Sequence, residues 1–180
     1  MSRIGKKPIA IPQEITISIE DKAIRVNGPK GELIWACPDK IKVSINDGAL
    51  FVERTGDSKA EKALHGLTRS VIHSMVTGVL QGYQKVLEIV GVGYRAQVSG
   101  NKIVLSLGYS QPIEFQLPES VKAIVDAKQT TITITGINKQ LLGQVAADLK
   151  ALRYPDSYKG KGIRYSGELL KLKAGKTGKK

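Results

Sequence analysis

The feature that most restricts the possible fold of this chain is an internal repeat at an offset of 80 residues. Identical or similar residues recur at that spacing: Lys22/Lys102, Ile24/Val104, Gly28/Gly108, Pro38/Pro118, Ile41/Val121, Lys42/Lys122, Val52/Ile132, Thr55/Thr135 and Gly56/Gly136. The offset then falls to 77, with three more pairs: Lys62/Lys139, Leu64/Leu141 and Gly66/Gly143. A repeat of this length with one short insertion indicates a duplicated domain.

Each copy has the pattern of a small antiparallel sheet covered on one face by one helix, which is an α+β arrangement. Alternating apolar and polar residues predict strands near 15–19, 23–26, 41–45 and 49–54, and again near 85–90, 94–98, 102–107, 112–116, 121–125 and 130–135. Ser58 followed by Glu61 is a capping box, which predicts a helix from there to Gly82. The spacing of leucine and valine predicts a second helix over 138–152.

Positive charge is concentrated at the two ends of the chain. The 180 residues carry a net charge of +12, of which residues 1–10 contribute +3 and the last thirty residues +7. A surplus kept only for solubility would be spread over both repeats. The concentration of positive charge at the two ends of the chain instead favours contact with a polyanion. The short basic arm with Arg3, Lys6 and Lys7 is expected to order only on assembly.

These patterns divide the chain into a first repeat with its basic arm over 1–82, a second repeat over 83–152 and a basic C-terminal extension over 153–180. No apolar run approaches the roughly 18 residues that cross a bilayer, and the N-terminal residues lack the apolar stretch of a signal peptide. The extension has no apolar stripe suited to a headgroup layer. We therefore expect no membrane contact, a cytoplasmic location, and nucleic acid as the polyanion.

Catalytic and cofactor-binding motifs lack the context that they need. Gly91–Ala96 matches the G-x-G-x-x-A form of a dinucleotide-binding turn, but the residues that follow alternate like a strand and do not open a helix. His65 and His73 have no partners at metal-ligand spacing and are expected at the surface or partly packed, and Cys37 is expected to be a buried, inert thiol. We expect no enzyme, cofactor, metal or small-molecule substrate. A nucleotide-dependent enzyme built on this turn is the alternative that dinucleotide binding would expose.

The segment RYPDSYKGKGIRY, residues 153–165, combines cations, glycines and tyrosines. Alternating lysines and glycines would let the backbone approach a phosphate ridge, while the interleaved tyrosines could stack on unpaired bases. The two arginines could make bidentate phosphate contacts, and Tyr165 is expected to pack into the core. The candidate RNA-binding residues are Arg153, Tyr154, Tyr158, Lys159, Gly160, Lys161, Gly162, Arg164, Lys171 and Lys173, with Arg3, Lys6 and Lys7 of the arm.

Three stretches, SRIGKKPI at the start, GVGYRA in the middle and PDSYKGKGIRY before a Lys-rich tail, together resemble the bacterial type of the large-subunit ribosomal protein six family. The resemblance covers essentially the whole chain. The family's signature falls on Pro155, Tyr158, Lys159, Gly160, Lys161, Gly162 and Ile163, and Asp156 stands where many relatives have glutamate.

The resemblance implies a non-enzymatic protein that binds large-subunit ribosomal RNA near the translation-factor-binding region and the sarcin-ricin loop. Binding would run mainly through the second domain and the C-terminal extension. Neighbouring ribosomal proteins would be partners, with translation factors close by. A free-standing RNA-binding or chaperone module stays open as an alternative function, and an organellar ribosome as an alternative location.

Overall fold

A computed structural model of the chain describes residues 3–20, 22–46 and 48–175. They form two compact units: the first ends at Gly82, the second begins at Tyr83, and Ile137–Lys139 is grouped with the first. Each unit has its own apolar core.

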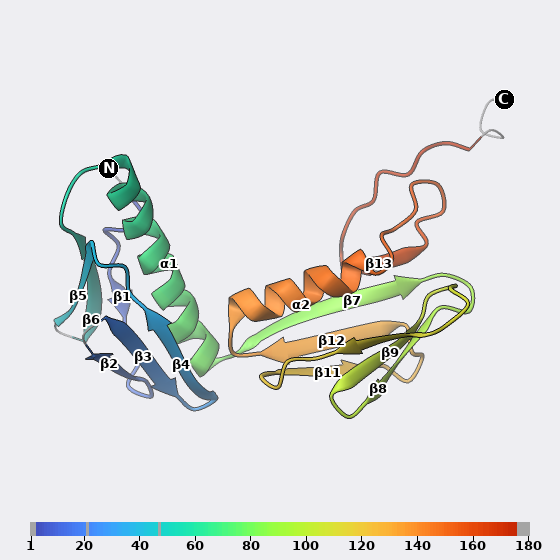
Figure 1. The fold of residues 1–180 in the computed structure, drawn as a ribbon, viewed down its shortest axis with the longest axis horizontal. Coiled ribbons are helices and arrows are strands. Elements are labelled where there is room, and N and C mark those ends of the chain that lie inside the picture. Colours follow the sequence, from blue (N-terminus) through green and yellow to red (C-terminus); the bar gives the residue numbers. More distant parts are fainter. Residues whose placement is uncertain (1–2, 21, 47, 176–180) are drawn as a thin grey trace. The chain divides into compact units, whose positions relative to one another are not determined.

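The strands described in the first unit form two antiparallel sheets, with the orders β1-β6-β5 and β2-β3-β4. The elements are β1 (Ile9–Ala10), β2 (Thr16–Glu20), β3 (Ala23–Gly28), β4 (Gly31–Ala36), β5 (Ile41–Asn46), β6 (Ala49–Arg54) and α1 (Lys59–Leu80). Helix α1 packs on strands of both sheets (Figure 1). The Ser58 hydroxyl accepts the Glu61 N–H and the Glu61 carboxylate accepts the Ser58 N–H, so the predicted capping box is confirmed.

The second unit repeats this arrangement with one additional strand. Its sheets have the orders β10-β9-β8 and β11-β12-β7-β13. The elements are β7 (Tyr83–Val90), β8 (Arg95–Ser99), β9 (Lys102–Ser106), β10 (Ile113–Gln116), β11 (Val121–Val125), β12 (Thr131–Gly136), α2 (Lys139–Ala151) and β13 (Gly162–Tyr165). Strand β13 follows α2 and lies along the edge of β7 (Figure 1).

Strand order confirms the duplication and the α+β class. The order β1-β6-β5 corresponds to β7-β12-β11, and β2-β3-β4 corresponds to β8-β9-β10. The described strands of each unit are divided between two sheets, whereas the sequence predicted one. Three strands were not predicted: β1 has only two residues, β4 has an exposed Ile34 that hides its alternation, and β13 lies in the Gly- and Lys-rich segment.

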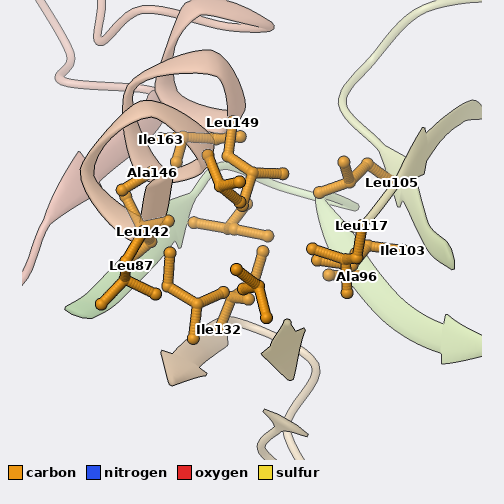
Figure 2. Packing of buried hydrophobic residues seen from close by; sticks show 14 of the residues in the cluster. Leu87, Ala96, Ile103, Leu105, Leu117, Ile132, Leu142, Ala146, Leu149 and Ile163 are labelled. Atoms are coloured by element: carbon orange, nitrogen blue, oxygen red, sulfur yellow. The ribbon is translucent and has the colours of Figure 1, made fainter. Parts of the chain in front are cut away.

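The core of the second unit includes a residue from the segment expected to be an extension. Ile163 of β13 has no exposed surface and belongs to the same apolar cluster as Ala146 and Leu149 of α2 (Figure 2). Strand β13 is therefore an integral part of this unit. Its pairing with β7 also fixes one end of the loop formed by residues 153–161.

Candidate nucleic-acid interface

Residues 153–165 belong to the second unit and do not form a separate extension. Strand β13 pairs antiparallel with β7, with Gly162 opposite Val90. The Ile163 N–H also donates to the Arg153 carbonyl oxygen at 2.8 Å. The boundary expected at 152 differs from the structure because the edge of β7 is open to pairing, and an unpaired edge strand is unfavourable. The part of the tail beyond 175 lies outside the described residues.

Gly160 and Gly162 are required by the local backbone. Gly160 has φ +67° and Gly162 has φ +148°, values that side chains rarely permit. A Cβ atom at Gly162 would lie 2.6 Å from the Tyr154 carbonyl oxygen. Both glycines are buried. The structure thus gives them a role in shaping the turn into β13, in place of the close phosphate approach expected from the sequence.

Asp156 holds the loop that precedes β13. Its carboxylate accepts the N–H groups of Tyr158 and Lys159 at 3.2 and 2.9 Å. Its own N–H donates to the Lys161 carbonyl oxygen, and its carbonyl accepts the Gly160 N–H, both at 2.9 Å. The bond from the Lys159 N–H is the main reason that the pKa of Asp156 lies below its ordinary value. Sequence reasoning missed this role, although an aspartate that bonds to backbone two residues on is a known turn signal.

The loop directs aromatic and cationic side chains to solvent. Tyr154 and Tyr158 are 65% and 59% exposed, far more than packing against a sheet would leave. Lys159 is exposed and Lys161 is half-buried. Arg153 stands at the start of this segment.

A second stretch lies against the loop and adds two cations. The Lys173 N–H donates to the Ser157 carbonyl oxygen at 2.8 Å. Leu170 and Leu172 lie beside Gly160. Lys171 and Lys173 are exposed. The fold therefore places the stretch that carries both lysines against the loop.

Arg164 differs from this group because it already has a carboxylate partner. It donates to Glu88 of β7 at 3.0 Å through Nε and forms a salt bridge at 2.9 Å. The Ser166 hydroxyl donates to the same carboxylate at 2.9 Å. The bonds from Ser166 and then Arg164 hold the pKa of Glu88 below its ordinary value. A guanidinium paired in this way joins β13 to β7, so the structure does not favour the expected bidentate phosphate contact for Arg164.

Tyr165 packs against the second core, in agreement with the sequence prediction. The ammonium groups of Lys85 and Lys150 lie 5.2 and 4.9 Å from the centre of its ring. Lys150 also donates to Glu168 at 2.6 and 2.8 Å, which is the main reason that the pKa of Glu168 is lowered. These contacts hold the C-terminal end of β13 and the residues that follow it.

The N-terminal cations lie in the first unit, and the arm that carries them is folded. Gly5 packs so closely on His65 that a Cβ atom would lie 2.5 Å from the ring. Arg69 donates to the carbonyl oxygens of Lys7 and Pro8 at 3.2 and 3.4 Å. The structure thus shows residues 3–7 in contact with α1, and the ordering of this arm only on assembly stays a prediction.

The side chains of Arg3, Lys6 and Lys7 are exposed. His65 is only 3% exposed, and its ring bonds to the Val52 carbonyl oxygen at 2.9 Å, so it is more deeply packed than the sequence indicated.

Other kinds of site find little support in the structure. The turn after β7 leads into strand β8, so no helix N-terminus is present there to bind a pyrophosphate. Within 3–20, 22–46 and 48–175, no group of three or more His, Cys, Asp or Glu side chains is placed to hold a metal ion. No helix in the described ranges combines the length and apolar character needed to span a bilayer. Burial raises the pKa of the half-buried Cys37 thiol, which makes it less reactive.

The fold and the site define a duplicated α+β protein that displays cations and tyrosines on a loop fixed by its second sheet. The family model described as Ribosomal protein L6 matches residues 11–82 and 90–166. The proteins named large ribosomal subunit protein uL6 from Thermodesulfovibrio yellowstonii, Koribacter versatilis and Picosynechococcus sp. are 59%, 51% and 49% identical, each over the full length of both chains. The chain therefore belongs to the ribosomal protein L6 family, and the resemblance noted in its sequence is confirmed.

Proposed function

We propose that the protein is a non-enzymatic constituent of the large ribosomal subunit, and that it binds ribosomal RNA through a basic loop surface on its second unit. This surface consists of Arg153, Tyr154, Tyr158, Lys159, Lys161, Lys171 and Lys173. The observation that carries this proposal is which cations of the second unit form salt bridges and which do not. Within the described residues these cations form no salt bridge, whereas Lys150, which precedes them in the chain, and Arg164, which lies between Lys161 and Lys171, are paired with carboxylates.

The chemistry of this surface suits RNA. Lysine ammonium groups displace condensed counterions from phosphates, which gives affinity without sequence reading. Exposed tyrosine rings beside them can stack on unpaired bases or lie against ribose. Because Asp156 and β13 already fix the loop, little conformational entropy is lost when RNA binds, and a preformed surface binds more tightly than a flexible tail.

We further propose that the second unit makes the main contact, close to the translation-factor-binding region and the sarcin-ricin loop, in the ribosome of the cytoplasm. The support is the family resemblance together with the position of the basic loop surface on that unit. Exposed Arg3, Lys6 and Lys7 of the first unit would supply a separate, weaker contact, and neighbouring ribosomal proteins would be partners. Hydroxyl-radical footprinting of the RNA by the full chain tests the location. Protection confined to other regions of the RNA would reject it.

The salt dependence of RNA binding tests the surface itself. The double variant Lys159→Ala/Lys161→Ala should reduce the magnitude of the negative slope of log K against log salt by roughly one to two units, because each phosphate contact contributes about 0.7 to 0.9. The matched control is Lys42→Ala/Lys122→Ala, which removes two exposed lysines at equivalent positions of the two repeats. Its slope should be unchanged within about half a unit. Equal slopes for the two double variants would reject the basic loop surface.

Substitution is a cleaner test than removal of the last thirty residues. Such a truncation would delete β13 and the buried Ile163 along with the cations. A loss of RNA binding would then report damage to the core as much as loss of charge.

A further inference from the structure

Tyr109, which the sequence did not single out, fixes the first residue of the basic loop surface. It lies between β9 and β10, and its hydroxyl donates to the carbonyl oxygen of Leu152 at 3.1 Å. The Arg153 guanidinium stacks over its ring, 4.9 Å from the ring centre. The β9–β10 loop, which belongs to a different sheet from β13, therefore determines where the Arg153 guanidinium lies.

Arg153 lies over an aromatic ring, and no carboxylate of the described residues is paired with it. Within the part of the chain that the structure describes, it forms no salt bridge, whereas Arg164 is paired with Glu88. Its polar neighbours are the phenol groups of Tyr94 and Tyr109. A guanidinium has five N–H donors, so one that lies over a ring and hydrogen-bonds to phenol groups still has N–H groups for a bidentate acceptor, and phosphate is an acceptor that fits this fork.

The loop that carries Tyr109 is itself held in place. Tyr94 packs on Gly91 and Gly108, where an added Cβ atom would lie 2.6 and 2.8 Å from its ring. Tyr109 remains 48% exposed, and Tyr154, the neighbour of Arg153 in the chain, is 65% exposed. The packing of Tyr94 therefore holds the loop that carries Tyr109, while the Tyr109 ring stays exposed enough to be reached by a ligand.

We propose that Tyr109 is a positioning residue of the RNA interface, which holds the Arg153 guanidinium for a bidentate contact with one phosphate of the bound RNA. The interface then extends from the basic loop surface onto the β9–β10 loop. This inference rests on the proposed function. Arg153 supplies the contact, and Tyr109 acts on the RNA through Arg153.

A double-mutant cycle on the full chain, with large-subunit ribosomal RNA as the probe, tests the proposal. Arg153→Ala should weaken binding roughly tenfold, the loss of a charge-assisted hydrogen-bonded contact. Tyr109→Ala should weaken it several-fold in the otherwise unchanged chain and scarcely at all when Arg153 is already alanine. Non-additivity of this kind is the signature of one residue acting through another.

Two conservative variants separate geometry from charge. Arg153→Lys should keep the salt slope, because it keeps the charge, yet lose most of the affinity that Arg153→Ala loses, because lysine lacks the planar fork. Tyr109→Phe keeps the ring and should bind within about threefold of the unchanged chain. The control Ile124→Ala, at a 65% exposed position of β11, should bind like the unchanged chain.

Additive losses in the cycle, or full affinity for Arg153→Lys, would overturn the inference. Tyrosine fluorescence of each variant during urea unfolding shows whether the second unit is intact, so a loss of binding with unchanged stability counts as an effect on the interface. If the lysine double variant weakens binding and the cycle is additive, only this inference falls. If the lysine double variant binds with an unchanged slope, the proposed basic loop surface falls instead.

Discussion

Replacing Ile163 by alanine measures how much the segment before the Lys-rich tail contributes to the second core. The side chain is fully buried in the cluster that α2 covers. The substitution removes three methyl or methylene groups, and at about 0.8 kcal/mol each the lost transfer free energy is about 2.4 kcal/mol. Incomplete collapse around the cavity adds to this, so we expect the free energy of unfolding of the second unit to fall by about 3 kcal/mol.

The distribution of aromatic residues allows each unit to be followed separately. The only tryptophan, Trp35, lies in the first unit, and all six tyrosines lie between 83 and 165. Urea unfolding of the full chain should therefore be monitored by both fluorophores. With a urea m-value of about 2 kcal/mol/M, the tyrosine midpoint should fall by about 1.5 M. The Trp35 midpoint should stay in place, because the two cores share no residue.

Ile124→Ala is the matched control, since Ile124 lies on β11 of the same unit and is 65% exposed. Its effect should stay within about 0.5 kcal/mol, or about 0.25 M in urea. If Ile163→Ala shifts the tyrosine midpoint no further than this control, β13 is not part of the core. The reasoning would also fail if both fluorophores shifted equally.

Gly162→Ala should destabilise the second unit by about 1–3 kcal/mol in urea unfolding, because its Cβ would meet the Tyr154 carbonyl; Gly143→Ala in α2, where space is open, should instead raise stability by up to about 1 kcal/mol. Glu88 and Glu168 have lowered pKa values in the folded chain, so their contribution to stability is full at neutral pH and is lost as pH falls below about 4. Glu168→Gln should flatten this loss in unfolding curves at pH 7 and pH 3.5, and an unchanged acid sensitivity would contradict it. A chain ending at 152 should aggregate on size-exclusion chromatography, because the edge of β7 is left unpaired, while a chain ending at 175 should elute as the full chain does.

The sequence by itself determined the features that depend on local periodicity and composition. The 80-residue repeat predicted the duplication, alternation predicted most of the strands, and Ser58 with Glu61 predicted the start of α1, all of which the structure contains. The stretches that resemble the ribosomal protein six family identified the family correctly. These signals are readable because strand alternation, helix capping and short motifs involve residues close together in the chain.

Only the tertiary structure decided which cations of residues 153–165 are paired with carboxylates. Arg153 and Arg164 are the same residue type in one short segment, yet Arg164 is neutralised by Glu88 and Arg153 is stacked on Tyr109. Nothing in the local pattern distinguishes them, because their partners come from β7 and from the β9–β10 loop, far earlier in the chain. The pairing of β13 and the burial of His65 could not be predicted from the sequence for the same reason. Both depend on residues that are distant in the chain and become neighbours only in the folded protein.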